Sequence, residues 1–237
     1  MADAAPAVKR FWKDVSVAAG PDGHAITLDG RPVRTPGRLP LALPHLALAI
    51  AIADEWRAVG EEIDPRAMPL TGLANVAIER IATEPAPFIA NLAAYAESDL
   101  LCYRAEAPEA LVARQAAAWD PLLDWARRRY DIHIDTVSGI IHRAQPPLTL
   151  ARLSDAVAAR SAFELAGLSP IVTITGSLIA GLTLIEGAAD ADQIWHAAQI
   201  DEAWQVEKWG DDDLAIATRT AHRADFDAGV LLLSLLD

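Results

Sequence analysis

Residues 201–210, DEAWQVEKWG, contain the side chains of this chain that are best suited to chemistry. Asp201 and Glu202 are adjacent carboxylates, and His196 and His222 lie on either side of them in the sequence. A carboxylic acid and an imidazole can act as general acid and base when they meet. One interpretation is therefore a small-molecule enzyme whose acidic site is centred on Glu202.

The other common signatures of enzymes are missing from the sequence. Residues 176–183, GSLIAGLT, have the glycine spacing of a phosphate-binding loop, but Leu182 stands where that loop needs a lysine. No HExxH or paired CxxC occurs, and the aspartate run 211–213 lacks the spaced oxygens and the glycine of a calcium loop. We therefore expect no cofactor and no metal.

A single helix over 190–210 would position the acidic segment. Asp190 is a natural N-cap for it, and Gly210 is a natural stop. At about 100° per residue, Glu202 shares a face with two indole rings. That stripe comprises Trp195, Glu202, Val206 and Trp209, and a neighbouring stripe comprises Ile194, Ala198, Asp201 and Gln205. The sequence predicts a carboxylate bracketed by tryptophans.

This arrangement has two further interpretations besides catalysis. Both tryptophans could belong to the core, with the acid capping a helix or pairing with an arginine. Alternatively the face could bind another protein, because tryptophan is enriched at binding hot spots and a carboxylate within apolar surface pairs strongly with an arginine. A purely structural interaction module is a third class of protein that fits. Composition leaves these alternatives open.

The overall composition bounds the class of protein. With 237 residues, 52% of them hydrophobic, the chain can bury a core, and its net charge of −13 argues against nucleic acid as a partner. Arg127, Arg128 and Arg129 are either the solvated end of a helix or a site for phosphate or an acidic partner. The one cysteine, Cys102, is expected to be a small buried hydrophobe in a reducing compartment.

The order of elements predicts an α+β fold in two domains. The first, 1–82, is a small mixed α/β domain whose strands are expected at 15–18, 25–28, 32–35 and 39–43 and whose helices are expected at 44–59 and 71–81. The prolines of TEPAP (83–87) mark the boundary. The second domain, 83–237, reads as helical, with helices over 87–97, 108–130, 150–165, 170–186, 190–209 and 213–236, and a small strand or hairpin within 131–142.

One segment imitates a membrane span, because residues 165–185 carry no charge. Its glycines, serines and threonines argue instead for a buried central helix that starts at Ser169-Pro170 and runs to about Glu186. Thr173, Ser177 and Gly181 would give that helix a face of small side chains, where another helix can lie close. The N-terminal residues lack the pattern of a signal or transit peptide, so we expect no membrane insertion and a bacterial cytoplasm.

Six stretches spread over nearly the whole chain occur together in one known family. They are RFWKDVSV (10–17), LDGRPVRTP (28–36), ADEWRAVGEEIDPRAMPLTGLAN (53–75), ESDLLCYRAEAPEALVARQAAAWDPLLDWA (97–126), TGSLIAGL (175–182) and DEAWQVEKWGDDD (201–213). The last is similar to an acidic-x-x-Gln-x-x-x-Trp-Gly-Asp signature. On these motifs the chain resembles the F(1)-ATPase assembly chaperones, which handle the alpha subunit of ATP synthase.

The resemblance implies a function and a set of residues. It implies a chaperone, monomeric when free, that binds free alpha subunit and shields it until beta subunits arrive, without catalysis. The expected place of action is the bacterial cytoplasm, or the organellar matrix for family members with import sequences. The critical acid falls on Glu202, with Asp201 as the alternative. The partner-binding residues implied are Glu202, Asp201, Gln205, Trp195 and Trp209, and further motif positions, structural or in contact, are Trp56, Asn75, Asp99, Tyr103 and Arg104.

Overall fold

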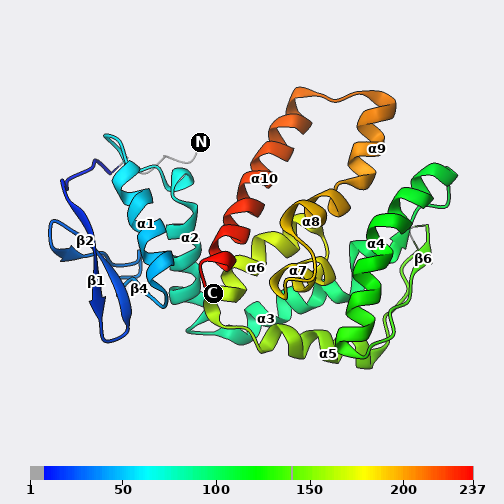
Figure 1. The fold of residues 1–237 in the computed structure, drawn as a ribbon, viewed down its shortest axis with the longest axis horizontal. Helices are drawn as coiled ribbons and strands as arrows, with labels where there is room; N and C mark the ends of the chain where they lie inside the picture. Colours follow the sequence, from blue (N-terminus) through cyan, green and yellow to red (C-terminus); the bar gives the residue numbers. More distant parts are fainter. Residues whose placement is uncertain (1–7, 140, 237) are drawn as a thin grey trace, which may run out of the picture. The chain divides into compact units, whose positions relative to one another are not determined.

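The computed structural model describes residues 8–139 and 141–236 and divides the chain into two compact units. The first unit takes in the residues up to Pro85, together with Ala162–Gly167 and the residues from Leu231 onward. The second takes in Ala86–Ser161 and Leu168–Val230. The sheet of β1 to β4, within residues 15–43, belongs to the N-terminal part, and helices dominate the rest (Figure 1), so the predicted α+β class is confirmed.

The first unit is built on a small antiparallel sheet. Strands β1 (Val15–Gly20) and β2 (Gly23–Leu28), expected at 15–18 and 25–28, form a hairpin around Pro21-Asp22-Gly23, a sequence typical of tight turns, with Val15 opposite Leu28. The short strands β3 (Arg31–Pro32) and β4 (Ala42–Leu43) both pair with β2. Ile26 of β2 and Leu43 of β4 are fully buried, so both strands contribute side chains to the core.

Helix α1 (Leu46–Ala58) covers this sheet, and helix α2 (Pro69–Val76) packs against α1. Helix α1 buries Leu48 and Ile52 completely, four residues apart on one helix face. Helix α2 continues into a π-helical turn, Ala77–Ile81, and a 3₁₀ turn, Pro65–Ala67, precedes it. The carboxylate of Glu55 accepts hydrogen bonds from the amides of Leu70 (2.7 Å) and Thr71 (2.8 Å), which satisfies the free N–H groups at the start of α2.

The remaining helices are, in chain order, α3 (Pro85–Ala93), α4 (Glu109–Tyr130), α5 (Pro147–Ala158), α6 (Ala162–Thr175), α7 (Leu178–Ile185), α8 (Ala191–Ala198), α9 (Ile200–Trp209) and α10 (Asp213–Ser234). Short 3₁₀ turns cover Ala94–Ser98 and Leu100–Cys102. The first residues of α6 and the last of α10 belong to the first unit. Cys102 is buried, as predicted.

The small strand predicted within 131–142 is confirmed. This strand, β6 (Val137–Ser138), pairs in parallel with β5 (Tyr103–Arg104), more than thirty residues earlier in the chain. The arginine triplet ends α4, and two of its members pair with carboxylates of the same chain. Arg127 pairs with Asp124 at 2.8 Å, and Arg129 pairs with Glu186. For these two arginines the helix-end interpretation fits the structure.

The predicted central helix from Ser169 to Glu186 is wrong in its bounds. Pro170 lies inside α6, and this helix ends before Gly176, which adopts a left-handed φ of 66°. Ser177 then caps α7 by accepting a hydrogen bond from the amide of Ala180 at 2.9 Å. The predicted helix 150–165 fails similarly, because α5 ends at Ala158 and α6 begins at Ala162.

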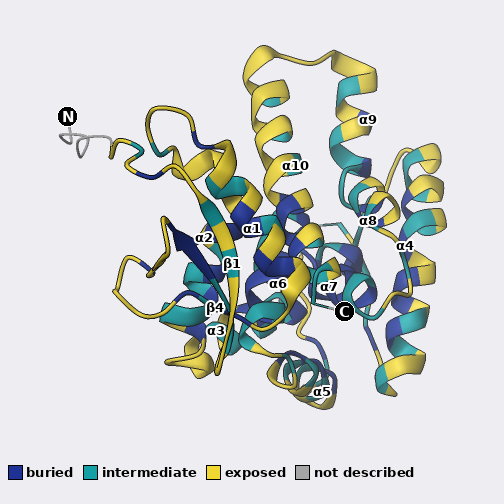
Figure 2. Ribbon diagram, turned by 60° about the vertical axis from the view of Figure 1, so that its left-hand side comes forward, coloured by how far each residue is buried: buried dark blue, intermediate teal, exposed yellow. Residues whose placement is uncertain are grey.

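Helix α7 is nevertheless the buried centre that the sequence indicated. Every residue from Leu178 to Thr183 is buried (Figure 2), and α7 packs against α4 and α8. A Cβ at Gly181 would collide with Val172 and Leu168 of α6, so glycine permits the close approach of these two helices. In the described residues, no helix combines the length and the apolar character that a membrane span needs.

The predicted single helix over 190–210 is two helices. Both ends are confirmed, since Asp190 forms a capping box with Gln193, and Gly210 ends α9 with a φ of 85°. Between them, however, Gln199 leaves the helical region at φ −98° and ψ 4°, and its amide donates to the carbonyls of Trp195 and His196. The single helix face predicted to carry Trp195, Glu202 and Trp209 is therefore interrupted between α8 and α9.

Candidate partner-binding site

One open depression in the second unit brings together predicted site residues from two distant segments. It has a volume of about 620 Å³ and is walled by α9, the start of α4 and the segment 100–108. Five predicted residues line it: Tyr103 and Arg104 from one segment, and Asp201, Gln205 and Trp209 from the other. We call this the α9 depression. Residues 201, 205 and 209 share one face of α9, since helix neighbours recur every four residues.

Asp99 fixes the segment 100–108 to the core. Its side chain is fully buried and accepts hydrogen bonds from the amides of Leu101 (3.1 Å) and Ile179 (2.9 Å). Burial raises the pKa of this carboxyl to about 6, against the opposing effect of those hydrogen bonds. The amide of Leu100 donates to the carbonyl of Gly176 at 3.0 Å. Asp99 therefore has a structural role: it joins the segment to the N-terminus of α7.

Arg104 is also held within the protein. Its guanidinium donates to Asp120 (2.7 Å) and to the carbonyl of Leu101 (3.1 Å), and it lies 5.1 Å from the ring centre of Trp119. Only 13% of its side chain is exposed. Trp119 is fully buried and donates its indole N–H to the carbonyl of Ala197 at 2.7 Å. These bonds make Arg104 part of the wall of the α9 depression.

A buried glutamine that sequence reasoning missed connects the two segments. The amide nitrogen of Gln115 on α4 donates to Asp201 at 2.6 Å, and its oxygen accepts from the backbone of Ala105 at 2.8 Å. Gln115 is 1% exposed. It therefore fixes the carboxylate of Asp201 relative to the segment 100–108. No short-range pattern marks Gln115, because its partners lie 10 and 86 residues away.

Tyr103 lies at the rim. Its hydroxyl is 3.0 Å from Nδ1 of His142, and Nε2 of His142 is 3.3 Å from Glu97. Burial raises the pKa of the Tyr103 hydroxyl above its ordinary value of 10.0, so the group is neutral at physiological pH. It can donate or accept a hydrogen bond but cannot serve as an anion.

Trp209 and Gln205 are the lining residues of α9 that lie exposed. Trp209 is 79% exposed, whereas Trp204, on the same helix, is only 9% exposed. The Trp204 ring is covered by Arg114 and Lys208, at 4.8 Å and 4.7 Å from its centre. An exposed indole beside a walled depression is the arrangement found at protein-binding hot spots.

Glu202 does not line this depression. It accepts a hydrogen bond from Arg219 of α10 at 2.9 Å, and Arg219 also pairs with Asp211. The Glu202 side chain is 43% exposed and that of Arg219 is 28% exposed, so the pair lies at the surface. The carboxylate is thus paired, as one interpretation held, but it is not sealed inside the protein.

The prediction that Trp195 and Trp209 share one helix face with Glu202 is wrong for Trp195, because the break at Gln199 places Trp195 on a separate helix. Trp195, on α8, packs its ring 5.3 Å from that of Phe226 on α10, and Arg223 lies 5.3 Å from the Trp195 ring centre. Arg223 also pairs with Asp192 of α8 at 2.9 Å. Trp195 therefore joins α8 to α10.

The enzyme interpretation gains no support from the arrangement around Glu202. Its carboxylate pairs with an arginine, whereas His196 lines a different groove and His222 is exposed on α10. Within residues 8–139 and 141–236, no group of three His, Cys, Asp or Glu side chains could hold a metal ion.

The remaining two motif residues lie in the first unit. Trp56 is half-buried on α1, with its ring edge-on to Trp12 at 5.2 Å, and Trp12 is 3% exposed. Asn75 is half-buried on α2. The pair of tryptophans anchors the chain before β1 against α1, which is a structural role for Trp56.

The fold and the α9 depression define a class: an α+β protein of two units with an open, aromatic surface suited to binding another macromolecule. Comparisons with known proteins give the family. Residues 9–127 match the family model of the ATP12 chaperone protein. The chain therefore belongs to the ATP12 chaperone family, the ATP synthase assembly factors that its motifs resemble.

Solved structures and a curated relative agree with this assignment. The crystal structure of Atp12 from Paracoccus denitrificans is 44% identical, with a TM-score of 0.92 over 97% of this chain and 98% of that chain. The Atu1473 protein from Agrobacterium tumefaciens is 40% identical, with a TM-score of 0.91 over 97% of this chain and 86% of that one. Mitochondrial Protein atp12 of Schizosaccharomyces pombe is 23% identical over 86% of this chain and 75% of its own length.

Proposed function

We propose that this protein binds the free alpha subunit of ATP synthase, shields the surface that alpha presents to its neighbours, and releases it when beta subunits bind. The observation that carries the proposal is the convergence of two family motifs on the α9 depression, where Trp209 stands 79% exposed. The protein performs no bond-making chemistry in this role.

The physical requirement for such a chaperone is simple. A subunit that awaits assembly exposes apolar surface meant for its neighbours, and large apolar patches aggregate. A partner that reversibly covers about 800 Å² of that surface is sufficient to protect it. Release occurs when a beta subunit competes for overlapping surface. The open form of the α9 depression suits reversible cover.

The lining residues divide the work. Trp209 and Gln205 are exposed and meet the client directly, with Trp209 as the apolar anchor. Asp201 is held by Gln115 with a carboxylate at the wall, where it accepts a hydrogen bond from a donor on the client. Glu202, on the adjoining face of α9, adds negative charge that favours a client surface rich in arginine or lysine.

Capture of purified alpha subunit by variants of the chaperone tests this proposal. We expect Trp209→Ala to weaken capture by at least about 2 kcal/mol, roughly thirtyfold in Kd, as removal of an exposed aromatic anchor does. Leu148→Ala is the matched control, because Leu148 is 60% exposed on α5, away from the depression. Circular dichroism checks that both variants are folded. Capture by Trp209→Ala that equals the Leu148→Ala control would refute the proposed site.

A further inference from the structure

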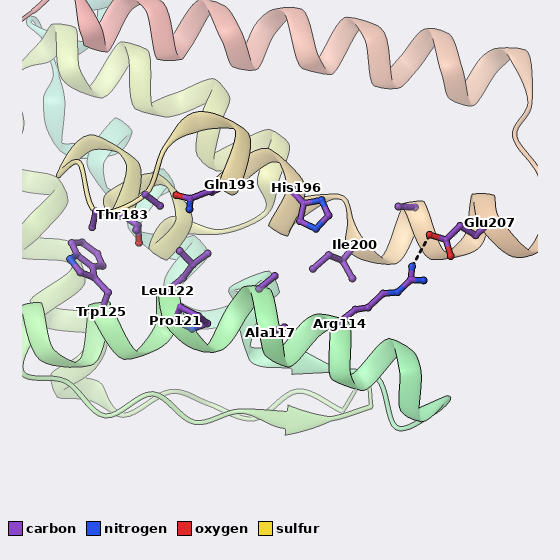
Figure 3. A pocket seen from close by; sticks show the side chains of 14 residues that line it. Arg114, Ala117, Pro121, Leu122, Trp125, Thr183, Gln193, His196, Ile200 and Glu207 are labelled. Atoms are coloured by element: carbon purple, nitrogen blue, oxygen red, sulfur yellow. Dashed lines mark hydrogen bonds and ion pairs between the residues drawn. The ribbon is translucent and has the colours of Figure 1, made fainter.

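A second hollow in the second unit lies on another face of α9. This groove, of about 530 Å³, runs between α4 on one side and the α7–α8 connection, α8 and α9 on the other (Figure 3). Trp125 stands at one end, and the ion pair between Arg114 and Glu207, at 2.7 Å, spans the other. We call it the α4–α8 groove. Ile200, Ala203 and Glu207 of α9 line it, whereas Asp201, Gln205 and Trp209 line the α9 depression.

The two walls of the groove differ in chemistry. The α4 wall presents Ala117, Pro121 and Leu122, and is apolar. The α8 wall presents Gln193 and His196, which are exposed and three residues apart on one helix face, about 5–6 Å from each other. The oxygen of Gln193 already accepts from the amide of Asp190 at 3.0 Å, so its NH₂ group remains to donate.

This spacing fits a strand-like peptide. Along one edge of an extended chain, backbone donors and acceptors recur every second residue, about 6.6 Å apart. Gln193 and His196 therefore lie at a separation that can engage two successive backbone groups on that edge. On the opposite wall, Pro121 has no N–H to donate to the carbonyl of Ala117, so that carbonyl lacks its α-helical partner along the groove.

The length of the groove sets the length of the segment. Arg114 and Trp125 are eleven residues apart on α4, which at about 1.5 Å per residue gives about 16 Å. An extended chain covers that distance with about five residues, at about 3.3 Å each. The small side chains of Ala117 and Ala203, one on each wall, leave the width for the apolar side chains of such a segment.

Negative charge at the Glu207 end of the groove favours a basic residue at the end of the bound segment. From Asp201 to Asp213 the chain carries Asp201, Glu202, Glu207, Asp211, Asp212 and Asp213 against Lys208 alone. The Glu207 side chain is 49% exposed, and exposed ion pairs such as its contact with Arg114 are weak. A cation that arrives from a partner can therefore share Glu207, while Arg114 keeps its place over the Trp204 ring.

We propose that the α4–α8 groove binds an extended apolar segment of about five residues that ends in a basic residue, contributed by a protein partner. The apolar side chains lie against α4, the peptide backbone bonds to Gln193 and His196, and the basic residue pairs with Glu207. The inference goes beyond the proposed function: it adds a second contact surface, and it rests on that function only in taking the segment to belong to the client.

A defined peptide tests the groove directly. The probe is a fluorescein-labelled hexapeptide amide, Val-Ala-Val-Leu-Val-Arg, whose binding to the full chain is followed by fluorescence anisotropy. We expect Ala117→Phe and Ala203→Phe, which fill the groove from opposite walls, each to weaken binding at least about tenfold. Ala217→Phe is the control, because Ala217 is likewise exposed but lies on α10, outside the groove. A peptide ending in glutamate should bind at least about tenfold more weakly than one ending in arginine.

Each other result overturns the proposal. Equal binding by the filled variants and the control, or by the arginine and glutamate peptides, excludes this occupant. A concentration-dependent dimer that Ala117→Phe abolishes would assign the groove to a second copy of the chain instead. Capture of alpha subunit separates the two proposals: if alpha is not the client, capture fails while the peptide still binds, and if the groove is wrong, the peptide fails while capture persists.

Discussion

Helices α7 and α9 show two ways of using a short helix in the same unit. Helix α7 has no charged residue, and its first six residues are buried. Helix α9 carries Asp201, Glu202, Glu207 and Lys208, and of its ten residues only Ile200 and Trp204 are buried. The buried carboxylate of Asp99 accepts a hydrogen bond from the amide of Ile179 in α7, whereas the carboxylates of α9 lie at the surface. Helix α7 stabilises the unit, and we propose that α9 contacts a partner.

The connections of α9 reflect this difference. Helix α7 is held by close packing on α4, α6 and α8. Helix α10 is joined to α9 by Arg219, which pairs with Glu202, and to α8 by Arg223, which pairs with Asp192. Exposed ion pairs contribute about 0–1 kcal/mol each. Substitutions on α9 should therefore affect binding, and substitutions around α7 should affect stability.

The largest effect on this contrast is expected from Asp99→Ala. The change leaves the buried amides of Leu101 and Ile179 without their acceptor, so we expect a loss of about 3 kcal/mol or more in the free energy of unfolding. Glu207→Ala, which removes an exposed carboxylate paired with Arg114, should lose much less, because solvent screens this pair. Urea unfolding measures both. Equal losses would show that the carboxylates of the two regions do not differ in their importance for stability.

The contrast explains which parts of the fold the sequence predicts. The β1–β2 hairpin, α4 and both caps of the 190–210 segment depend on local signals, Pro-Asp-Gly, periodicity and Asp190 with Gly210, and they are correct. The break at Gln199 was missed because neither glycine nor proline marks it. The parallel pairing of β5 with β6 was missed because each strand has two residues and their partners are distant.

The candidate site divides in the same way. The family motifs identify Asp201, Gln205 and Trp209, which the structure brings together with Tyr103. No pattern in the sequence could identify Gln115, whose two hydrogen bonds join segments far apart. Likewise the pairing of Glu202 with Arg219 depends on the turn between α9 and α10, which determines which faces of the two helices meet.

A smaller effect that sharpens the contrast is the pH dependence of Asp99. Its pKa is raised from 3.8 to about 6 by burial, so the folded state binds the proton more tightly than the unfolded chain does. The stability due to this group is fully present below pH about 4 and is lost as the pH rises through about 6. We expect the stability of the wild type relative to Asp99→Asn to increase by on the order of 2 kcal/mol as the pH falls from 7 to 4.

Chemical denaturation of both proteins at matched pH values measures this difference. Because all other titrating groups are shared, the subtraction isolates the group at position 99. A difference that decreases as the pH falls would show that the amides around Asp99 hold its carboxylate ionised, and that burial is the weaker influence there.

The smallest effect on stability, and the most informative for α9, is expected from reversing the ion pair of Glu202 and Arg219. Glu202→Lys should change the free energy of unfolding by less than about 1 kcal/mol, because the pair is exposed, yet abolish capture of alpha subunit. The double variant Glu202→Arg, Arg219→Glu restores the pair with its charges exchanged. Arg219 also contacts Asp211, so the glutamate introduced by Arg219→Glu would lie beside a second carboxylate. Asp211→Asn is therefore added to both the Glu202→Lys protein and the protein with the exchanged pair.

The exchanged pair separates direct contact from positioning. If Glu202 meets the client, the arginine that replaces it repels the same basic surface, and capture stays lost although α9 and α10 are joined again. If Glu202 acts only by holding α9 against α10, the exchanged pair recovers capture to the level of Asp211→Asn alone. Recovery would leave Trp209 as the anchor of the α9 depression and make Glu202 a positioning residue, which urea unfolding of the same proteins would reveal as a matching recovery of stability.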